Sequence, residues 1–378
     1  MSNIVIAGYT RSAFHLANKG ALRKSRPDDL AGAVIKGLIA KTKVNPDHIE
    51  DLIMGCAFPE GEQGLNVGRN VVFLAGLPIS VGGVTVNRFC GSSMQSVHQA
   101  AGAIKMGAGE AYICAGIESM SRITMGGFNP MPNPTLVSAG HKAYIGMGET
   151  AENLAEKYQI SRKAQEEFAV ESHKRAAAAQ AAGKFKDEIV PVKGDGGMID
   201  SDGCIRADST LEGLAGLKPA FSEKGTVTAA TSSPLTDGAS AVLVCTEEYA
   251  KKHGLVPLAR ILSIAVSGCA PEIMGIGPVG ATQKALARAG LKLNQIDIIE
   301  LNEAFAAQSL AVVKDLGVDL SKTNIDGGAI ALGHPLGATG ARITGKAAAL
   351  LKREKKKYAL ATQCIGGGQG IATILEAM

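Results

Sequence analysis

The sequence predicts an α/β protein of two domains whose halves have similar folds. Segments typical of strands and helices alternate along both halves of the 378-residue chain, which indicates sheets covered by helices. Hydrophobic residues make up 46% of the chain and charged residues only 20%, a balance typical of a compact globular protein. A repeat within the chain indicates that the two halves share one duplicated fold.

The first half of the chain shows the alternation in sequence order. Residues 4–7 form a short apolar run that predicts a strand directly after the N-terminus. The further predicted elements are a helix near 29–41, a strand at 49–56, a strand at 85–88, a helix after Cys90 and a strand at 111–115. Residues 11–26 are basic, and we expect a loop there. This β-α-β-α-β order indicates a parallel sheet.

The second half repeats this order after residue 257. Its predicted elements are strands at 260–266 and 297–301, helices at 280–289 and about 338–351, and strands at 358–362 and 371–375. Residues 38–49 resemble residues 285–296, and Phe58 and Phe305 follow at the same separation of 247 residues (296 − 49 and 305 − 58). The shared order and the constant separation favour a duplicated fold.

Residues 119–235 have no counterpart in the second half and are interpreted as an insertion. They contain a Gly/Pro/Met loop at 125–134, an amphipathic helix at 162–182 and a glycine-rich polar stretch at 193–206. A long insertion between core strands usually covers or shapes a site. The predicted domains are the first part of the N-terminal half (1–118), an inserted loop domain (119–235), the end of the N-terminal half (236–256) and the C-terminal half (257–378).

Charge, cysteine content and hydropathy exclude several classes of protein. The net charge of +4 is too small to indicate a nucleic-acid-binding protein, although it would help to attract a phosphate-bearing ligand. Seven cysteines without a CxxC pair indicate reduced thiols. No apolar run approaches the length of about 18 residues that a membrane helix needs. The N-terminus enters the first predicted strand without a recognisable signal peptide, and we expect a cytoplasmic protein.

A cysteine within residues 84–96 is the first candidate for chemistry. Cys90 follows a β-rich run, and apolar residues then recur at helical spacing, at Met94, Val97 and Ala101. Backbone N–H groups and the helix dipole stabilise a thiolate near a helix N-terminus. With a basic partner beside this helix start, we expect Cys90 to be a nucleophile held in its ionised form, with an inert buried cysteine as the alternative at this point.

Three further stretches in the second half carry reactive side chains or glycine loops. They are Asn302-Glu-Ala-Phe-Ala306 after a strand, Gly333-His334-Pro-Leu-Gly337 ahead of a helix, and Cys364-Ile-Gly366-Gly-Gly-Gln-Gly370 after a strand. Glycine-rich loops present backbone N–H groups to developing negative charge. A phosphate-binding role for the last stretch is disfavoured because the Lys and Ser/Thr of a P-loop are missing. Wide separation also disfavours a zinc site, and we expect no metal.

Four motifs in this order resemble those of the thiolase family, the acetyl-CoA acyltransferases. They are Asn-Arg-Phe-Cys90-Gly-Ser-Ser, Asn302-Glu-Ala-Phe-Ala, Gly333-His334-Pro-x-Gly and Cys364-x-Gly-Gly-Gly. The resemblance covers essentially the whole chain, including the repeat and the insertion. It implies two similar five-stranded α/β halves, packed as α-β-α-β-α layers, with the insertion as a loop domain over the site.

The resemblance also implies which residues perform the chemistry. Cys90 would take the acyl group as a thioester, His334 would be its general base, and Cys364 would be the second acid/base. His334 and a water held by Asn302 would stabilise the enolate oxygen of acetyl-CoA. The backbone N–H groups of Cys90 and Gly366 would form a second oxyanion hole.

CoA is implied as a substrate, and neither a metal nor a redox cofactor is implied. Met147 would line the acyl or pantetheine tunnel, while Ser233 and Arg206 would contact the CoA. The resemblance further implies a homodimer or homotetramer. A partner of β-oxidation, with hydratase and dehydrogenase activities, is an open question at this point.

The implied reaction is the thiolytic cleavage of a 3-ketoacyl-CoA by CoA, in fatty-acid β-oxidation, to acetyl-CoA and a shortened acyl-CoA. The alternative is an acetoacetyl-CoA thiolase that condenses two acetyl-CoA molecules. Short-chain biosynthetic thiolases carry His-Met-Gly where this chain has Gly146-Met147-Gly148, which favours the degradative type. A non-catalytic acyl-CoA or sterol-carrier-like binder would not need all three reactive side chains. A ketoacyl-synthase-like enzyme would pair its cysteine with two histidines.

Overall fold

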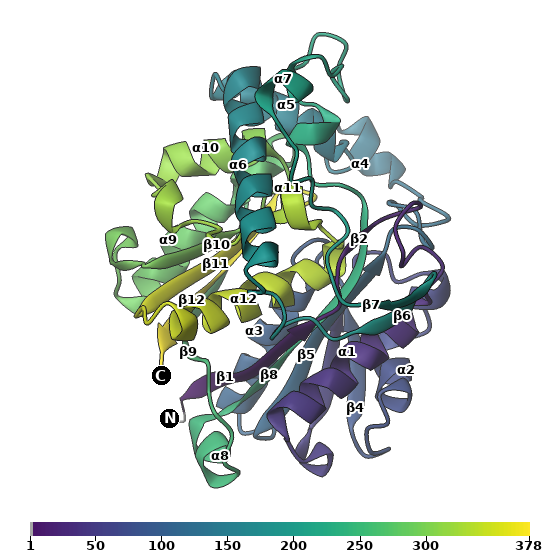
Figure 1. Ribbon diagram of the computed structural model, residues 1–378, viewed down its shortest axis with the longest axis vertical. Coiled ribbons are helices and arrows are strands. Elements are labelled where there is room, and N and C mark those ends of the chain that lie inside the picture. Colours follow the sequence, from purple (N-terminus) through teal and green to yellow (C-terminus); the bar gives the residue numbers. More distant parts are fainter. Residues whose placement is uncertain (1–2) are drawn as a thin grey trace.

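The first half of the chain forms a five-stranded layer with helices on both of its faces (Figure 1). A computed structural model describes residues 3–378. The elements of this half are β1 (Ile4–Arg11), β2 (His15–Leu16), α1 (Pro27–Thr42), β3 (Asp51–Gly55), α2 (Val67–Leu74), β4 (Gly82–Val86), α3 (Ser92–Lys105), β5 (Ala111–Ser119), β8 (Thr236–Thr246) and α8 (Glu247–Lys252). They confirm the predicted strands and helices and add β2, α2, β8 and α8, of which β2 lies within the segment 11–26 that was expected to be a loop.

The second half repeats the order of the first. Its elements are β9 (Ala259–Gly268), α9 (Gly277–Ala289), β10 (Ile298–Leu301), α10 (Ala306–Leu316), α11 (Ala329–Leu332), α12 (Leu336–Arg353), β11 (Tyr358–Ile365) and β12 (Gln369–Ala377). Strand β10 begins 247 residues after β3 begins at Asp51, and β11 begins 247 residues after β5 begins at Ala111. The duplication inferred from the sequence is therefore visible in the arrangement of the elements.

The two halves join in one mixed sheet. Its strand order is β10-β11-β12-β9-β1-β8-β5-β3-β4, and the halves meet where Val5 and Ile6 of β1 pair with β9. Pairing is parallel only between β3 and its neighbours β4 and β5 and between β10 and β11. The expected parallel sheet is therefore only partly correct, because β8 and β12 return antiparallel to β5 and β11. In the second half, an isolated bridge between Ile299 and Thr323 takes the place of a fifth strand.

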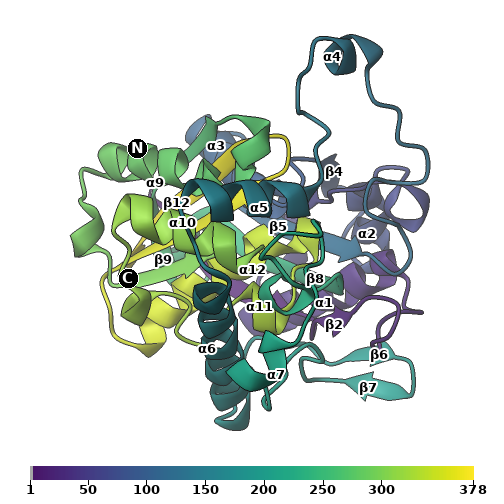
Figure 2. The ribbon, with the colours of Figure 1, turned by 90° about the horizontal axis from the view of Figure 1, so that it is seen from above.

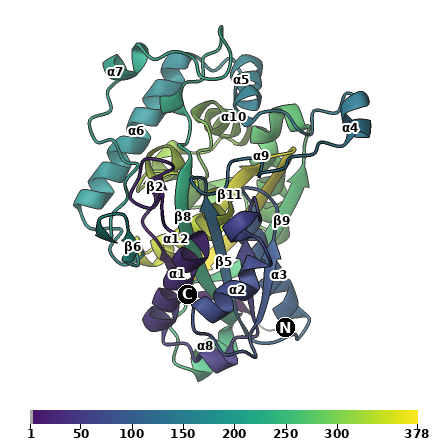
Figure 3. The same ribbon diagram turned by 90° about the vertical axis from the view of Figure 1, so that its right-hand side faces the viewer.

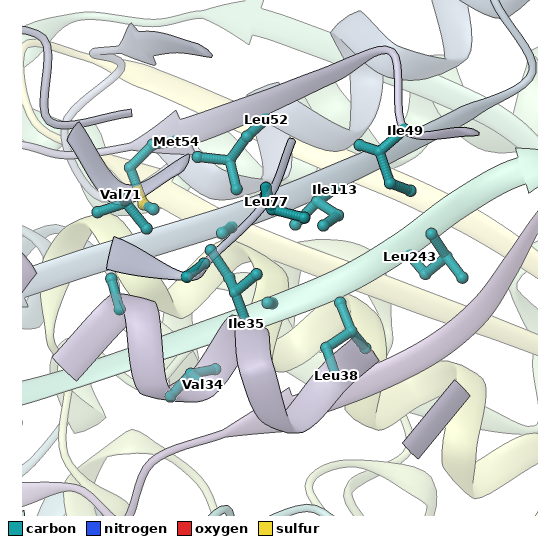
Figure 4. Packing of buried hydrophobic residues seen from close by; sticks show 14 of the residues in the cluster. Val34, Ile35, Leu38, Ile49, Leu52, Met54, Val71, Leu77, Ile113 and Leu243 are labelled. Carbon is teal, nitrogen blue, oxygen red and sulfur yellow. The ribbon is translucent and has the colours of Figure 1, made fainter. Parts of the chain in front are cut away.

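Helices α3 and α12 pack against each other between the strands of the two halves, which gives the α-β-α-β-α layers. Their apolar faces, including Met94 and Ile343, share one buried cluster with the inward-facing side chains of the strands of both halves. Helices α1 and α2 cover the outer face of the first half, and α9 and α10 that of the second. Figure 4 shows Ile35 and Leu38 of α1 against Ile113 and Leu243 of the first sheet. The layered fold is thus confirmed.

The insertion lies beside the ends of the strands of the large sheet, and its longest helix is α6 (Figures 1 and 3). Its elements are α4 (Pro134–Ser138), α5 (Met147–Lys157), α6 (Arg162–Ala181), β6 (Val192–Gly194), β7 (Gly197–Ile199) and α7 (Leu211–Ala215). Helix α4 lies at the tip of a long arm that projects from the body of the protein (Figure 2). Helix α5 packs against α10 and α6 against α11, so the insertion contacts the second half near the predicted site.

Candidate active site

A tight turn places Cys90 immediately before α3. Phe89 has a φ of 42°, a left-handed conformation that is rare for a bulky residue and marks a strained position. The turn is held by Ser92, whose hydroxyl donates to the Phe89 carbonyl at 2.6 Å and accepts from the Arg88 N–H at 2.9 Å. Cys90 itself is only 9% exposed, so its sulfur is not solvated like a free thiol.

Burial keeps the Cys90 thiol protonated. It raises the pKa of Cys90 to about 11, while hydrogen bonds from the backbone of Gly366 and of Cys90 itself act in the opposite direction. The carboxylate of Glu118 raises the pKa further. The helix end alone does not hold the sulfur ionised, because the cost of burying the charge exceeds the stabilisation by the N–H groups. A base is needed to activate Cys90.

His334 is held rigidly at the start of α12, with both ring nitrogens near polar groups. Its backbone N–H donates to Thr236 Oγ1 at 3.0 Å, and its Nδ1 lies 2.6 Å from Thr339 Oγ1. Nε2 lies 3.3 Å from Nδ2 of Asn302. Burial, assisted by the positive charge of Arg342, lowers the pKa of His334 to about 3. The ring is therefore neutral at physiological pH and has a lone pair that can accept a proton.

Asn302 reaches this histidine from the end of β10. Its side chain is fully buried, and its Oδ1 has no hydrogen-bond partner among residues 3–378. The next residue, Glu303, points away from His334 and binds Ser172 Oγ at 2.6 Å and Asn324 Nδ2 at 2.7 Å. In the Asn302-Glu303 pair, the amide therefore lies at the site, while the carboxylate holds α6 of the insertion through Ser172.

Cys364 and Gly366 come from the opposite side, at the end of β11. Burial is the main cause that raises the pKa of Cys364 well above its usual range, and the neighbouring Cys90 is the second. The two sulfurs are therefore close enough to influence each other. Gly366 donates a backbone hydrogen bond toward the Cys90 sulfur, and a side chain at Gly366 would lie 3.4 Å from Met147 Sδ.

A buried carboxylate that the sequence analysis missed joins the two halves beneath these side chains. Glu118, at the end of β5, accepts hydrogen bonds at 2.8 Å from the N–H groups of Ala57 and Gly337 and from Nε2 of Gln63. Gly337 lies three residues after His334, so Glu118 fixes the N-terminus of α12 against the first half. The sequence did contain a signal for Glu118, which is a charged residue at the end of an apolar strand. A charge buried there needs hydrogen-bond or ionic partners, so it indicates a specific contact.

Gln363 and Thr339 were also missed. The Gln363 side-chain amide donates a hydrogen bond to the backbone carbonyl of Cys90, and Thr339 contacts His334 as described above. Both residues lie within or beside predicted motifs, but only the three-dimensional structure shows which way their side chains point.

The three residues predicted to contact CoA lie at different distances from this centre. Met147, at the start of α5, is half-buried and packs in the cluster that contains Cys364. Ser233 donates its backbone N–H to the carbonyl of Ala304 at 2.9 Å, which places it beside the Asn302 motif. Arg206 is exposed, and its backbone N–H donates to His173 Nδ1 at 3.1 Å.

The site therefore combines a nucleophile, a neutral imidazole, a second thiol, an amide and backbone N–H donors in one water-poor environment. This set can form a covalent intermediate, move a proton and stabilise an oxyanion. Within residues 3–378, no three or more His, Cys, Asp or Glu side chains are grouped so that they could hold a metal ion. In the same part of the chain, no helix has both the length and the apolar character needed to cross a membrane.

Comparisons with known proteins agree along the whole chain. The family described as "Thiolase, N-terminal domain" matches residues 4–248, and "Thiolase, C-terminal domain" matches residues 255–377. The 3-ketoacyl-CoA thiolase of Vibrio vulnificus strain YJ016 is 49% identical over 389 residues, and that of Bacillus subtilis strain 168 is 46% identical over 389 residues. Both alignments cover 100% of this chain and 100% of the relative.

Solved structures with the same fold include the human mitochondrial 3-ketoacyl-CoA thiolase. It superposes with a TM-score of 0.91 at 39% sequence identity, covering 100% of this chain and 99% of that chain. A second structure of the human enzyme, in complex with CoA, also gives a TM-score of 0.91, at 40% identity. It covers 100% of this chain and 98% of the human chain.

Proposed function

The chain belongs to the thiolase family, and we infer that it is an acyltransferase that cleaves a 3-ketoacyl-CoA with CoA to acetyl-CoA and a shortened acyl-CoA. This is the thiolytic step of fatty-acid β-oxidation. The observation that carries the proposal is the meeting of three distant segments, because Cys90 lies beside Cys364 and packs in one cluster with Leu336, two residues after His334. The full-length similarity to bacterial 3-ketoacyl-CoA thiolases supports the degradative reaction.

In the first half-reaction, Cys90 attacks the 3-keto carbon while His334 takes the thiol proton. The tetrahedral alkoxide collapses, the bond between the second and third carbons breaks, and the electron pair passes to acetyl-CoA as its enolate. Cys364 protonates this carbanion, so that acetyl-CoA leaves and the acyl group stays on Cys90 as a thioester. Because Cys90 starts as a thiol and His334 as a neutral imidazole, proton transfer accompanies the attack.

In the second half-reaction, the Cys364 thiolate takes the proton of an incoming CoA thiol. The CoA sulfur attacks the acyl-Cys90 carbonyl, and the shortened acyl-CoA leaves as the Cys90 thiolate is expelled. The protonated His334 returns its proton to Cys90, which restores the starting state. One thioester replaces another, so the step needs no external source of energy.

Oxyanions form in both half-reactions and need hydrogen-bond donors. The Asn302 amide and the His334 ring lie 3.3 Å apart and would together stabilise the enolate oxygen of acetyl-CoA, the amide acting through a held water. The backbone N–H groups of Cys90 and Gly366, which already point toward the Cys90 sulfur, would stabilise the oxyanion of the tetrahedral intermediate. Preorganised donors of this kind are effective because the buried site excludes bulk water.

CoA would enter along the insertion. Met147 is half-buried beside Gly366 and Cys364, as expected for a residue that lines the tunnel for the acyl or pantetheine chain. Ser233 lies beside the Asn302 motif through its hydrogen bond to Ala304, and the exposed Arg206 offers a positive charge to the nucleotide phosphates. The human relative whose structure contains CoA supports CoA as the ligand.

A second candidate function is an acetoacetyl-CoA thiolase that condenses two acetyl-CoA molecules with the same residues. It is disfavoured because Gly146 stands where short-chain biosynthetic thiolases carry a histidine. Kinetics of thiolysis with C4 and with C8–C16 3-ketoacyl-CoA distinguish the two. We expect kcat/KM for the longer substrates to equal or exceed that for C4, whereas a strict preference for C4 would establish the alternative.

Four further assignments extend this proposal. The domains are 1–118 and 236–256 for the N-terminal half, 119–235 for the inserted loop domain and 257–378 for the C-terminal half. The location is the cytoplasm, in keeping with the bacterial relatives. The assembly is a homodimer or homotetramer, which a solution mass measurement tests. A β-oxidation partner that carries hydratase and dehydrogenase activities is the macromolecule to test for binding.

A further inference from the structure

The hydrogen bonds around His334 form a chain with a single direction. Thr339 lies one helical turn after Pro335 in α12, and its hydroxyl donates to the Pro335 carbonyl at 3.1 Å. A hydroxyl has one hydrogen, so this bond leaves Thr339 Oγ1 only as an acceptor toward the imidazole. Nδ1 of His334 lies 2.6 Å away, and with the hydroxyl hydrogen directed at Pro335 it is Nδ1 that carries the hydrogen of this contact.

The Asn302 amide, in the orientation that the structure gives it, agrees with the same assignment. Nε2 of His334 faces Nδ2 of Asn302 at 3.3 Å, and an amide nitrogen is a donor only. A hydrogen on Nε2 would oppose the amide N–H, whereas a lone pair there accepts it. All three side chains are buried, with Thr339 and Asn302 fully inaccessible, so water is not available to satisfy the wrong tautomer.

We propose that Thr339 is a positioning residue that accepts the Nδ1–H of His334 and so keeps the Nε2 lone pair directed at Asn302 and the reacting groups. When His334 takes the proton of Cys90, both ring nitrogens carry hydrogen, and Thr339 still accepts the one on Nδ1. The hydroxyl therefore serves the neutral ring and the imidazolium without rearranging. The effect on catalysis rests on the proposed thiolase function, but the tautomer itself does not.

Three variants separate this role from ordinary packing. Thr339→Val keeps the shape of the side chain and removes the hydroxyl, and Thr339→Ser keeps the hydroxyl. Thr344→Val is the matched control, because Thr344 is equally buried in α12, donates to the Gly340 carbonyl at 2.7 Å and has no recorded contact with His334. Thermal unfolding of all three measures the general cost of removing a buried hydroxyl from this helix.

The first measurement is the ¹⁵N NMR spectrum of histidine-labelled protein, with the His334 signals assigned from a His334→Gln variant. In the wild type we expect a protonated Nδ1 and an unprotonated Nε2. In Thr339→Val we expect a mixture of both tautomers, and in Thr339→Ser and Thr344→Val the wild-type pattern. A wild-type ring protonated on Nε2, or a Thr339→Val spectrum identical to that of the wild type, would overturn the proposal.

The second measurement is steady-state thiolysis. We expect kcat of Thr339→Val to fall by about ten- to a hundredfold, the range for the loss of a hydrogen bond to a charged group, with KM for CoA unchanged. Thr339→Ser and Thr344→Val should stay close to the wild type. An equal loss in Thr339→Val and Thr344→Val would show that packing alone is responsible. A wild type with the expected tautomer but no thiolysis would refute the proposed function and leave the tautomer assignment intact.

Discussion

The side-chain amide of Gln363 donates a hydrogen bond to the backbone carbonyl of Cys90. Gln363 directly precedes Cys364 on β11, while Cys90 belongs to the turn before α3. One buried bond therefore fixes the separation between two sulfurs that come from different halves of the chain. The two cysteines are thereby held relative to each other by a contact between β11 and the turn before α3.

Replacing Gln363 by methionine tests this connection. Gln363→Met keeps the volume and removes the donor, so we expect a loss of about 1–3 kcal/mol in the free energy of unfolding. A small shift of Cys90 should also lower kcat by about ten- to a hundredfold. Denaturant unfolding and steady-state thiolysis measure the two effects. Gln308→Met is the control, because Gln308 is equally buried and its Nε2 has no partner in the described part of the chain. Similar losses in both variants would contradict the account.

Removing the second thiol should separate the two half-reactions. We expect Cys364→Ala to lose steady-state thiolysis, since no group remains to protonate the acetyl-CoA carbanion or to take the CoA proton. Transfer of an acyl group from an acyl-CoA to Cys90 expels CoA as a thiolate, a good leaving group that takes up the proton His334 removed from Cys90, so one equivalent of CoA per site should still be released. A thiol-reactive dye measures this release. A variant that releases no CoA would refute the division of roles between the two cysteines.

The reactivity of Cys90 should rise steadily with pH. Because burial raises its pKa to about 11, the thiolate is the minor form at neutral pH. Its fraction should grow about tenfold per pH unit between pH 7 and 9. Alkylation of the Cys90 peptide by iodoacetamide, followed by mass spectrometry, measures this dependence. A rate that reaches a plateau below pH 8 would show that the helix end does hold an ionised sulfur.

Asn302 should matter for the transition state more than for binding. Asn302→Ala removes an amide that lies 3.3 Å from His334, and we expect kcat to fall by about a hundred- to a thousandfold, as for the loss of one oxyanion donor. KM for CoA should change little. Thermal unfolding serves as the control for stability. A variant in which only KM increases would assign Asn302 to substrate binding.

The duplicated fold could be predicted because local hydrophobic patterns repeat in the same order in both halves of the sequence. The offset of 247 residues relates β3 to β10 and β5 to β11, and the predicted helices at the start of each half correspond to α1 and α9. The direction of β8 could not be predicted. It pairs with β5 across the whole insertion, and the strand–helix alternation says nothing about how the chain returns after such an interruption.

The motifs that carry the candidate reactive residues could also be recognised in the sequence, but not the electrostatic state of those residues. The prediction for Cys90 considered the helix end and not the cost of desolvation, which depends on packing contributed by residues far away in the sequence. Glu118, Gln363 and Thr339 were missed for the same reason. Each of these side chains hydrogen-bonds to a partner in a different element or in the next helical turn, and a single sequence does not show such contacts.

The most direct test of the account is to identify where the acyl group resides during the reaction. The protein is mixed with an acyl-CoA in the absence of free CoA, quenched in acid and digested, and the peptides are weighed by mass spectrometry. We expect the acyl mass on the peptide that contains Cys90, at one equivalent per chain, and neither adduct nor thiolysis with Cys90→Ala. An acyl group on another residue, or a Cys90→Ala variant that still performs thiolysis, would contradict the account.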